Sequence, residues 1–407
     1  MVEIAVISSS GVQAACEAME AIRSGKNVVF LGGGLSLTEE AALKSSASER
    51  GLLFLGPGCS TSILNGQGFG IWNRVRRGPI GIIGTFGSGI QQVACLVDGV
   101  GVSQALDVGC RDLSQSVNAS GTLSALKFLA EDPATEVIVM LSREPVTSVR
   151  RLVLEAAAET GKPAVACFLG GRAGGGQSGV KVVSTLEEAA AEALALSGAG
   201  KSDELSPALP EKFRKIAAEE YGKFGYGQKF VRGLYSGGAL CTETMVILRR
   251  YFDAIYSNVP LEPKLRLPDP HSSKGHACVD FGAEYLSGGK HPAVDLTPRC
   301  ERLVKEAKDW ETAVVLFDVL LGFGAHPNPA GELVPALREA KEIVEESGGY
   351  LSAVASVLGT GGDPQDLRRQ VEQLERAGVL VMNSNARAAK VAALIATQGK
   401  IWKSLAR

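Results

Sequence analysis

The sequence predicts an α/β protein in which a partial Rossmann-like domain is followed by two flavodoxin-like open sheets. Short apolar segments alternate with amphipathic helical segments along most of the 407 residues. This alternation is typical of parallel strands joined by helical crossovers. The chain also contains 49 glycines but only 13 Phe, 7 Tyr and 3 Trp. That composition suits a fold with many tight turns between strands and helices.

The first part, residues 1–77, follows a β-α-β-α-β pattern. Apolar runs predict strands at 2–8, 27–32 and 52–58, with helices between them. The first strand-to-helix turn reads S-S-S-G and lacks the G-x-G-x-x-G pattern of dinucleotide-binding domains. We therefore interpret this part as half of a nucleotide-binding-type domain, whose other half is either absent or supplied by another chain. The polar loop 56–66 is either a ligand loop at a strand end or a surface connection.

The rest of the chain contains two modules with the same order of elements, at 78–198 and 229–407. Between them, residues 199–228 are polar and charged and include two prolines, which predicts a linker. The common order indicates an internal duplication. Strands are expected at 80–84, 105–108, 137–141, 163–168 and 180–183 in the first module, and at 231–235, 277–281, 313–318, 351–355 and 379–382 in the second.

Each module opens with a strand, a glycine-rich loop and the start of a helix. The first copy is P-I-G-I-I-G-T-F-G-S-G-I-Q-Q at 79–92, and the second follows the strand at 231–235. Unpaired N–H groups and the helix dipole favour an anion at such a helix start. One loop alone could equally be a tight turn without a ligand. Because the device occurs twice, we expect a paired site for phosphate or carboxylate formed by Thr85, Gly87, Ser88, Gly89, Ser236, Gly237 and Gly238.

Composition limits the class of protein. The net charge is -2 and the sequence pI is about 6.2, so the chain lacks the basic excess that nucleic-acid binding needs. Eight cysteines are scattered without a C-x-x-C pair, and no signal peptide precedes them. No segment approaches the roughly 18 consecutive apolar residues of a membrane span. We expect a cytoplasmic protein with reduced thiols and no membrane partner.

With these motifs located, the chain resembles the FdrA family, a branch of the succinyl-CoA synthetase superfamily. The resemblance covers nearly the whole chain. It implies a CoA-binding-type Rossmann domain and two succinyl-CoA synthetase ligase-type domains, in a chain shortened at its amino-terminal end. The motifs that carry it are G-L-L-F-L-G-P-G-C-S-T-S (51–62), G-I-I-G-T-F-G-S-G-I-Q-Q (81–92), G-C-R-D-L-S (109–114), G-L-Y-S-G-G-A-L-C (233–241), G-G-K-H-P-A-V-D-L-T-P-R (288–299) and D-V-L-L-G-F-G-A-H-P-N-P (318–329).

The chain departs from the parent superfamily in its chemistry. Succinyl-CoA synthetases carry phosphate on a histidine in a G-H-A-G-type loop, and the matching stretch 168–179 contains no histidine. No histidine precedes His271, which excludes a phosphohistidine in the first module. There is also no recognisable ATP-grasp module.

The resemblance instead implies a subunit of the catabolic oxamate carbamoyltransferase of purine and allantoin degradation. That enzyme converts oxalurate and phosphate into oxamate and carbamoyl phosphate, and it needs further subunits. Phosphate or carbamoyl phosphate would then be a substrate, and the protein an oligomer. The alternatives are an acyl-CoA synthetase subunit that binds CoA in residues 1–77, and a scaffold without its own chemistry.

Other polar residues at predicted strand ends are candidates for the site. We assign Arg111 a catalytic role as an anion-binding guanidinium and Asp112 a role in substrate binding, or else a surface ion pair and a helix cap. Lys290 and Arg299 could bind an anion while His291 handles a proton, although the prolines there could simply shape an exposed loop.

His326 follows the strand ending at 318, where ligands of α/β sheets collect, and we assign it a catalytic role. His271 and His276 with Cys278 fit no usual zinc spacing, so we expect solvated loop histidines and no metal.

Overall fold

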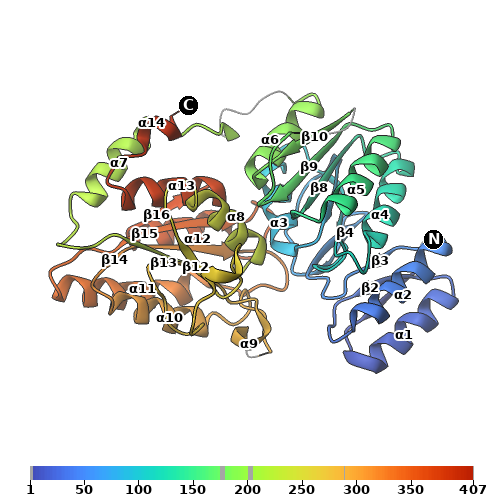
Figure 1. Ribbon diagram of the computed structural model, residues 1–407, viewed down its shortest axis with the longest axis horizontal. Helices are drawn as coiled ribbons and strands as arrows, with labels where there is room; N and C mark the ends of the chain where they lie inside the picture. Colours follow the sequence, from blue (N-terminus) through green and yellow to red (C-terminus); the bar gives the residue numbers. More distant parts are fainter. Residues whose placement is uncertain (1–2, 175–178, 200–204, 288, 407) are drawn as a thin grey trace. The chain divides into compact units, whose positions relative to one another are not determined.

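The computed structural model describes residues 3–174, 179–199, 205–287 and 289–406. The chain divides into two compact units, Met1–Leu205 and Ser206–Arg407. Each unit is built on parallel β-sheet, as the alternation of apolar and amphipathic segments predicts (Figure 1).

The first unit begins with a three-stranded parallel sheet in the order β1-β2-β3. Its strands are β1 (Ile4–Ile7), β2 (Asn27–Phe30) and β3 (Phe54–Leu55), and the helices between them are α1 (Gly11–Arg23) and α2 (Leu37–Glu49). Ser36 starts α2 with a capping box, in which its hydroxyl accepts from the N–H of Glu39 and the Glu39 carboxylate accepts from the N–H of Ser36. This sheet is the expected partial Rossmann-like layer.

A seven-stranded sheet follows in the order β10-β9-β8-β6-β7-β4-β5. Its five parallel strands take the flavodoxin-like order 2-1-3-4-5 when numbered along the chain. Helices α3 and α6 pack together on one face, and α4 and α5 cover the other (Figure 1). The elements are β4 (Thr61–Leu64), β5 (Gln67–Gly70), β6 (Arg77–Gly84), α3 (Gly87–Leu96), β7 (Val102–Asp107), α4 (Ser120–Glu131), β8 (Val137–Arg143), α5 (Thr147–Glu159), β9 (Ala164–Leu169), β10 (Val180–Val183) and α6 (Leu186–Leu196).

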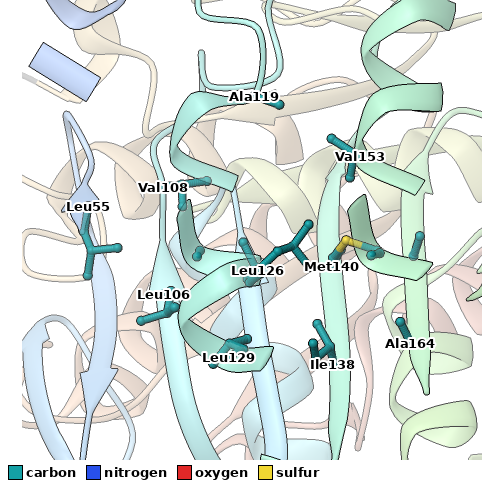
Figure 2. Packing of buried hydrophobic residues seen from close by; sticks show 14 of the residues in the cluster. Leu55, Leu106, Val108, Ala119, Leu126, Leu129, Ile138, Met140, Val153 and Ala164 are labelled. Atoms are coloured by element: carbon teal, nitrogen blue, oxygen red, sulfur yellow. The ribbon is translucent and has the colours of Figure 1, made fainter. Parts of the chain in front are cut away.

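The hairpin β4–β5 lies in this larger sheet, before the expected boundary at residue 77. Strand β4 pairs antiparallel with β7 through Ile63 and Ala105, and Ile63 and Leu64 are buried. The three-stranded sheet therefore ends with β3. Figure 2 shows the core that results, in which Leu126 and Leu129 of α4 lie against residues of β7 and β8.

The second unit has a six-stranded parallel sheet in the order β12-β13-β11-β14-β15-β16. Without the short edge strand β12, the order is again 2-1-3-4-5. Helices α8 and α13 pack together on one face, and α10, α11 and α12 cover the other (Figure 1). The elements are β11 (Phe230–Tyr235), α8 (Gly238–Leu248), β12 (Ile255–Ser257), β13 (His276–Asp280), α9 (Glu284–Ser287), α10 (Thr297–Ala307), β14 (Thr312–Leu320), α11 (Pro329–Glu346), β15 (Ser352–Leu358), α12 (Leu367–Arg376), β16 (Val379–Met382), α13 (Asn385–Ala396) and α14 (Trp402–Leu405).

Much of the expected linker 199–228 belongs to the second unit. Helix α7 (Lys212–Tyr221) lies within it and packs against α13. Its Glu220 is buried and accepts hydrogen bonds from the hydroxyls of Tyr350 (3.1 Å) and Ser352 (2.7 Å). The charged residues of this stretch therefore include structural contacts, which composition alone does not reveal. Residues 200–204 lie outside the described residues.

Candidate functional site

Both glycine loops lie where the strand order of their sheet reverses. The first loop leaves β6 and leads into α3, which starts at Gly87 with Phe86 as its N-cap. The second loop leaves β11 and leads into α8, which starts at Gly238 with Gly237 as its N-cap. The carboxyl ends of the central strands at such a reversal are the usual ligand position in open α/β sheets.

The second loop is occupied by a carboxylate of the chain itself, that of Asp318 on β14. Its Oδ1 accepts from the N–H of Ser236 at 2.8 Å. Its Oδ2 accepts from the Ser236 hydroxyl at 2.8 Å and from the N–H of Gly237 at 3.0 Å. Asp318 is completely buried. The donors of Ser236 and Gly237 that we expected to hold a ligand therefore hold Asp318.

Arg299 neutralises this buried carboxylate. Its Nη1 donates to Oδ1 of Asp318 at 2.6 Å and to the Asp318 carbonyl oxygen at 2.9 Å. The guanidinium is buried, which makes the pair an interior contact of the second unit. This geometry favours a positioning role for Arg299 over direct substrate binding.

The two candidate histidines lie on neighbouring loops of the same unit. The N–H of His326 donates to the carbonyl oxygen of Ala293 at 2.8 Å, which joins its loop to the loop of His291. Loss of water around the ring lowers the pKa of His291, while the Asp318 charge opposes this shift and the Arg299 charge adds to it; the residue as a whole is nevertheless exposed. Lys290 lies at the surface and pairs with Asp295 at 3.5 Å.

The first loop differs from the second because no carboxylate of the described residues accepts from its donors. The N–H of Thr85 donates to the backbone oxygen of Leu141 at 3.0 Å. Within the described residues, the Thr85 hydroxyl and the N–H groups of Phe86, Gly87 and Gly89 have no hydrogen-bond partner. Thr85 is only 5% exposed and lines a cavity of about 10 Å³ at the ends of β6 and β8. Ser88 does have an interaction partner.

Gly87 allows the first loop to approach the chain before β4. A Cβ atom there would lie 2.0 Å from Oγ of Ser60 and 2.6 Å from Oγ1 of Thr61. Ser60 is in turn held by Asp107 at the end of β7, whose Oδ2 accepts from the Ser60 N–H at 2.9 Å. The polar loop 56–66 thus contributes to the surroundings of the first glycine loop.

Sequence reasoning missed Arg143 and Asp107. Arg143 ends β8, and its guanidinium carbon lies 5.6 Å from the centre of the Phe86 ring, so it brings a positive charge to the start of α3. Burial raises the pKa of Asp107 to about 6, against hydrogen bonds that lower it. A D-x-G repeat could have identified Asp107, because Asp280 ends the equivalent strand β13 and both carboxylates accept from the glycine N–H two residues later.

Arg111 and Asp112 form part of a buried charge network in the first unit. Asp112 accepts from the N–H groups of Gly121 and Thr122 at the start of α4, both at 2.9 Å. It also accepts from Lys44 of α2 at 2.8 Å. Arg111 donates to Glu40 of α2 at 2.8 Å. These contacts favour the helix-cap and ion-pair interpretations over substrate binding.

Two members of the histidine–cysteine group, His276 and Cys278, lie on β13. No cluster of three or more His, Cys, Asp or Glu side chains suited to a metal is found among the described residues. The expectation of a solvated loop is wrong for His276, which starts β13 and stacks on Phe252 with ring centres 3.8 Å apart. Of the stretch 168–179, residues 175–178 lie outside the described residues. Among the helices described, none is long and apolar enough to span a membrane.

Comparison with known proteins identifies relatives of the chain. The sequence profile of the CoA-ligase family matches residues 234–395. The chain is 39% identical over 386 residues to Uncharacterized protein YahF of Escherichia coli (strain K12), covering 94% of this chain and 74% of that protein.

Solved structures match more distantly. The apo form of dinucleotide forming acetyl-coenzyme A synthetase 1 from Ca. Korarchaeum cryptofilum is 16% identical, with 100% of this chain and 86% of that chain covered and a TM-score of 0.36. ATP citrate lyase from Methanothrix soehngenii, in complex with citrate and coenzyme A, is 11% identical, with 81% and 51% covered and a TM-score of 0.27.

Proposed function

Because the chain belongs to the same family as YahF and contains a CoA-ligase domain, we propose that it is a subunit of an FdrA-type transferase. The reaction we propose is that of oxamate carbamoyltransferase, in which oxalurate and phosphate give oxamate and carbamoyl phosphate. The subunit works in an oligomer with partner subunits that complete the enzyme. No phosphohistidine of the first module takes part, since no histidine precedes His271.

The observation that carries this proposal is the first glycine loop. Its N–H groups at Phe86, Gly87 and Gly89 and the Thr85 hydroxyl lack partners among the described residues. The α3 dipole and Arg143 add positive potential there. Fixed donors of this kind stabilise anionic substrates and the oxyanion of a tetrahedral intermediate without a covalent enzyme intermediate.

The transfer consists of one bond formed and one bond broken. A phosphate oxygen attacks the carbamoyl carbon of oxalurate, and the carbon–nitrogen bond to the oxamate nitrogen breaks. The departing nitrogen takes up a proton, and phosphate loses one. The second unit offers candidates for these two proton transfers, His291 as the acceptor and His326 as the donor.

The test uses the complex of this chain with the subunits that copurify with it. Incubation with oxalurate and phosphate, followed by ³¹P NMR, should give a carbamoyl phosphate signal that disappears when either substrate is omitted. His326→Gln should lower the rate by a factor on the order of 10² to 10⁴, as for other general acids. A complete complex that forms no carbamoyl phosphate contradicts this function.

The second candidate is an acyl-CoA synthetase subunit, favoured by the CoA-ligase match over residues 234–395. CoA would then bind to the partial Rossmann-like layer, which ends with β3. Calorimetry of the intact chain with CoA distinguishes the two candidates. A saturable, tight signal supports the synthetase, and the absence of heat at high CoA concentration excludes CoA binding by this chain alone.

A further inference from the structure

The two duplicated modules provide an internal comparison, because the second glycine loop holds the Asp318 carboxylate and the first holds no carboxylate of the described residues. In the second unit, Leu234 of β11 pairs with Phe317 of β14, so Asp318 lies opposite the last residue of β11. In the first unit, Gly84 ends β6 and pairs with Leu141 of β8. Leu141 therefore occupies the position of Asp318 and offers no carboxylate.

The donors that serve Asp318 have counterparts in the first loop. The Ser236 hydroxyl and the Gly237 N–H both donate to one oxygen, Oδ2 of Asp318. The equivalent groups are the Thr85 hydroxyl and the Phe86 N–H, which have no partner in the described part of the chain. The third donor differs between the loops. The N–H of Ser236 donates to Asp318, whereas the N–H of Thr85 donates to the backbone oxygen of Leu141. The first loop thus keeps the two donors that bind one oxygen.

The Thr85 hydroxyl has no partner among the described residues, so it is a donor that a ligand oxygen can complete. The Thr85 residue is only 5% exposed, which holds this donor in place at the end of β6. Arg143, at the end of β8 beside Phe86, supplies the positive charge that Arg299 supplies to Asp318 in the second unit. The first loop therefore has the polar groups of the second loop without the resident anion.

We propose that the first loop binds the carboxylate of a small acid in the manner in which the second loop binds Asp318. One carboxylate oxygen accepts from the Thr85 hydroxyl and the Phe86 N–H, and the other faces Arg143. The chain binds one such anion, because Asp318 closes the second loop to ligands.

This inference rests on the proposed function, to which it adds that the first loop recognises the carboxylate of oxalurate and oxamate. The Thr85 hydroxyl and the Phe86 N–H match a single acceptor oxygen. In the equivalent second loop, the acceptor is the carboxylate of Asp318. Both features favour a carboxylate over the larger, tetrahedral phosphate at this position.

The test compares two identical substitutions in the first unit, Thr85→Val and Thr135→Val, with oxamate and inorganic phosphate as probes. Thr135 is buried before β8, and its hydroxyl bonds internally to Ser103 (2.7 Å) and Asp132 (2.8 Å). Thr85→Val should weaken oxamate binding about tenfold or more, since it removes a hydrogen bond to a charged group. It should not lower the melting temperature, because no protein hydrogen bond is lost. Thr135→Val should lower the melting temperature and leave the oxamate affinity unchanged.

Calorimetry on the wild-type chain should give one oxamate per chain and weaker binding of phosphate. Unchanged oxamate affinity in Thr85→Val, two oxamates per chain, tighter binding of phosphate than of oxamate, or no oxamate binding would each overturn the inference. If oxamate binds as expected but the full complex forms no carbamoyl phosphate, the carboxylate site stands and only the proposed reaction fails.

Discussion

Replacing Asp318 by alanine should destabilise the second unit strongly. The change removes the acceptor of three donors of the second loop, on Ser236 and Gly237. It also leaves Arg299 buried without the carboxylate that it contacts at 2.6 Å.

The magnitude follows from that buried ion pair. Removing one partner of such a pair costs about 3–5 kcal/mol, because the other charge stays in the interior. For a unit of this size, each kcal/mol lowers the melting temperature by about 2–4 °C. We therefore expect a fall on the order of 10 °C in the melting temperature.

Urea unfolding followed by circular dichroism measures the loss, with Asp318→Asn and Arg299→Met as companions. Asp318→Asn keeps one acceptor oxygen and should cost less than alanine. The double variant with Arg299→Met should cost less than the sum of its singles, by about 0.5–3 kcal/mol. Formate should partly restore the alanine variant, because the vacated position fits a small carboxylate. A cost below about 1 kcal/mol for Asp318→Ala, within the usual range of surface substitutions, would refute this account of the second loop.

Three further predictions concern single positions. Gly87→Ala should cost about 1–3 kcal/mol through its clash with Ser60, whereas Gly99→Ala, with nothing within 4 Å of the added Cβ, should be well tolerated in the same unfolding assay. The pKa of Asp107 is raised from 3.8 to about 6, so the folded state binds the proton more tightly than the unfolded state does. The free energy of unfolding of the wild type, relative to that of Asp107→Asn, should therefore fall as pH rises from 4 to 6 and then level off. The pKa of His276 is lowered, mainly by burial, from 6.5 to about 4. The wild type should therefore lose stability as pH falls from 6.5 to 4, and His276→Phe should lose less. Equal losses in the two proteins would contradict a stacked, neutral ring.

The main strands were predictable because parallel strands buried on both faces appear as continuous apolar runs. The hairpin β4–β5 was missed although Asn65 and Gly66, both with positive φ, form the Asn-Gly turn that is typical of two-residue hairpins. Strand β12 was missed because it has only three residues and lies next to a stretch rich in proline and charge.

The site was predictable in its position but not in its contacts. Glycines mark the two loops, yet the occupant of the second loop is Asp318, which is 82 residues away from Ser236 in sequence. Strand register brings the two together, and a single sequence does not specify register. The same holds for Asp112, whose partner Lys44 lies on a different layer of the first unit.

The contact between Lys44 and Asp112 has a consequence for how the first unit unfolds. Lys44 belongs to α2 over the three-stranded sheet, whereas Asp112 caps α4 over the seven-stranded sheet, and both side chains are fully buried. Separating the two sheets would break this buried ion pair, although Lys44 would keep Glu40 of its own helix at 2.8 Å, so opening the amino-terminal layer by itself carries an electrostatic cost. We infer that both sheets melt in one cooperative transition, and that a fragment starting after β3 would lose α4 as well as the residues removed.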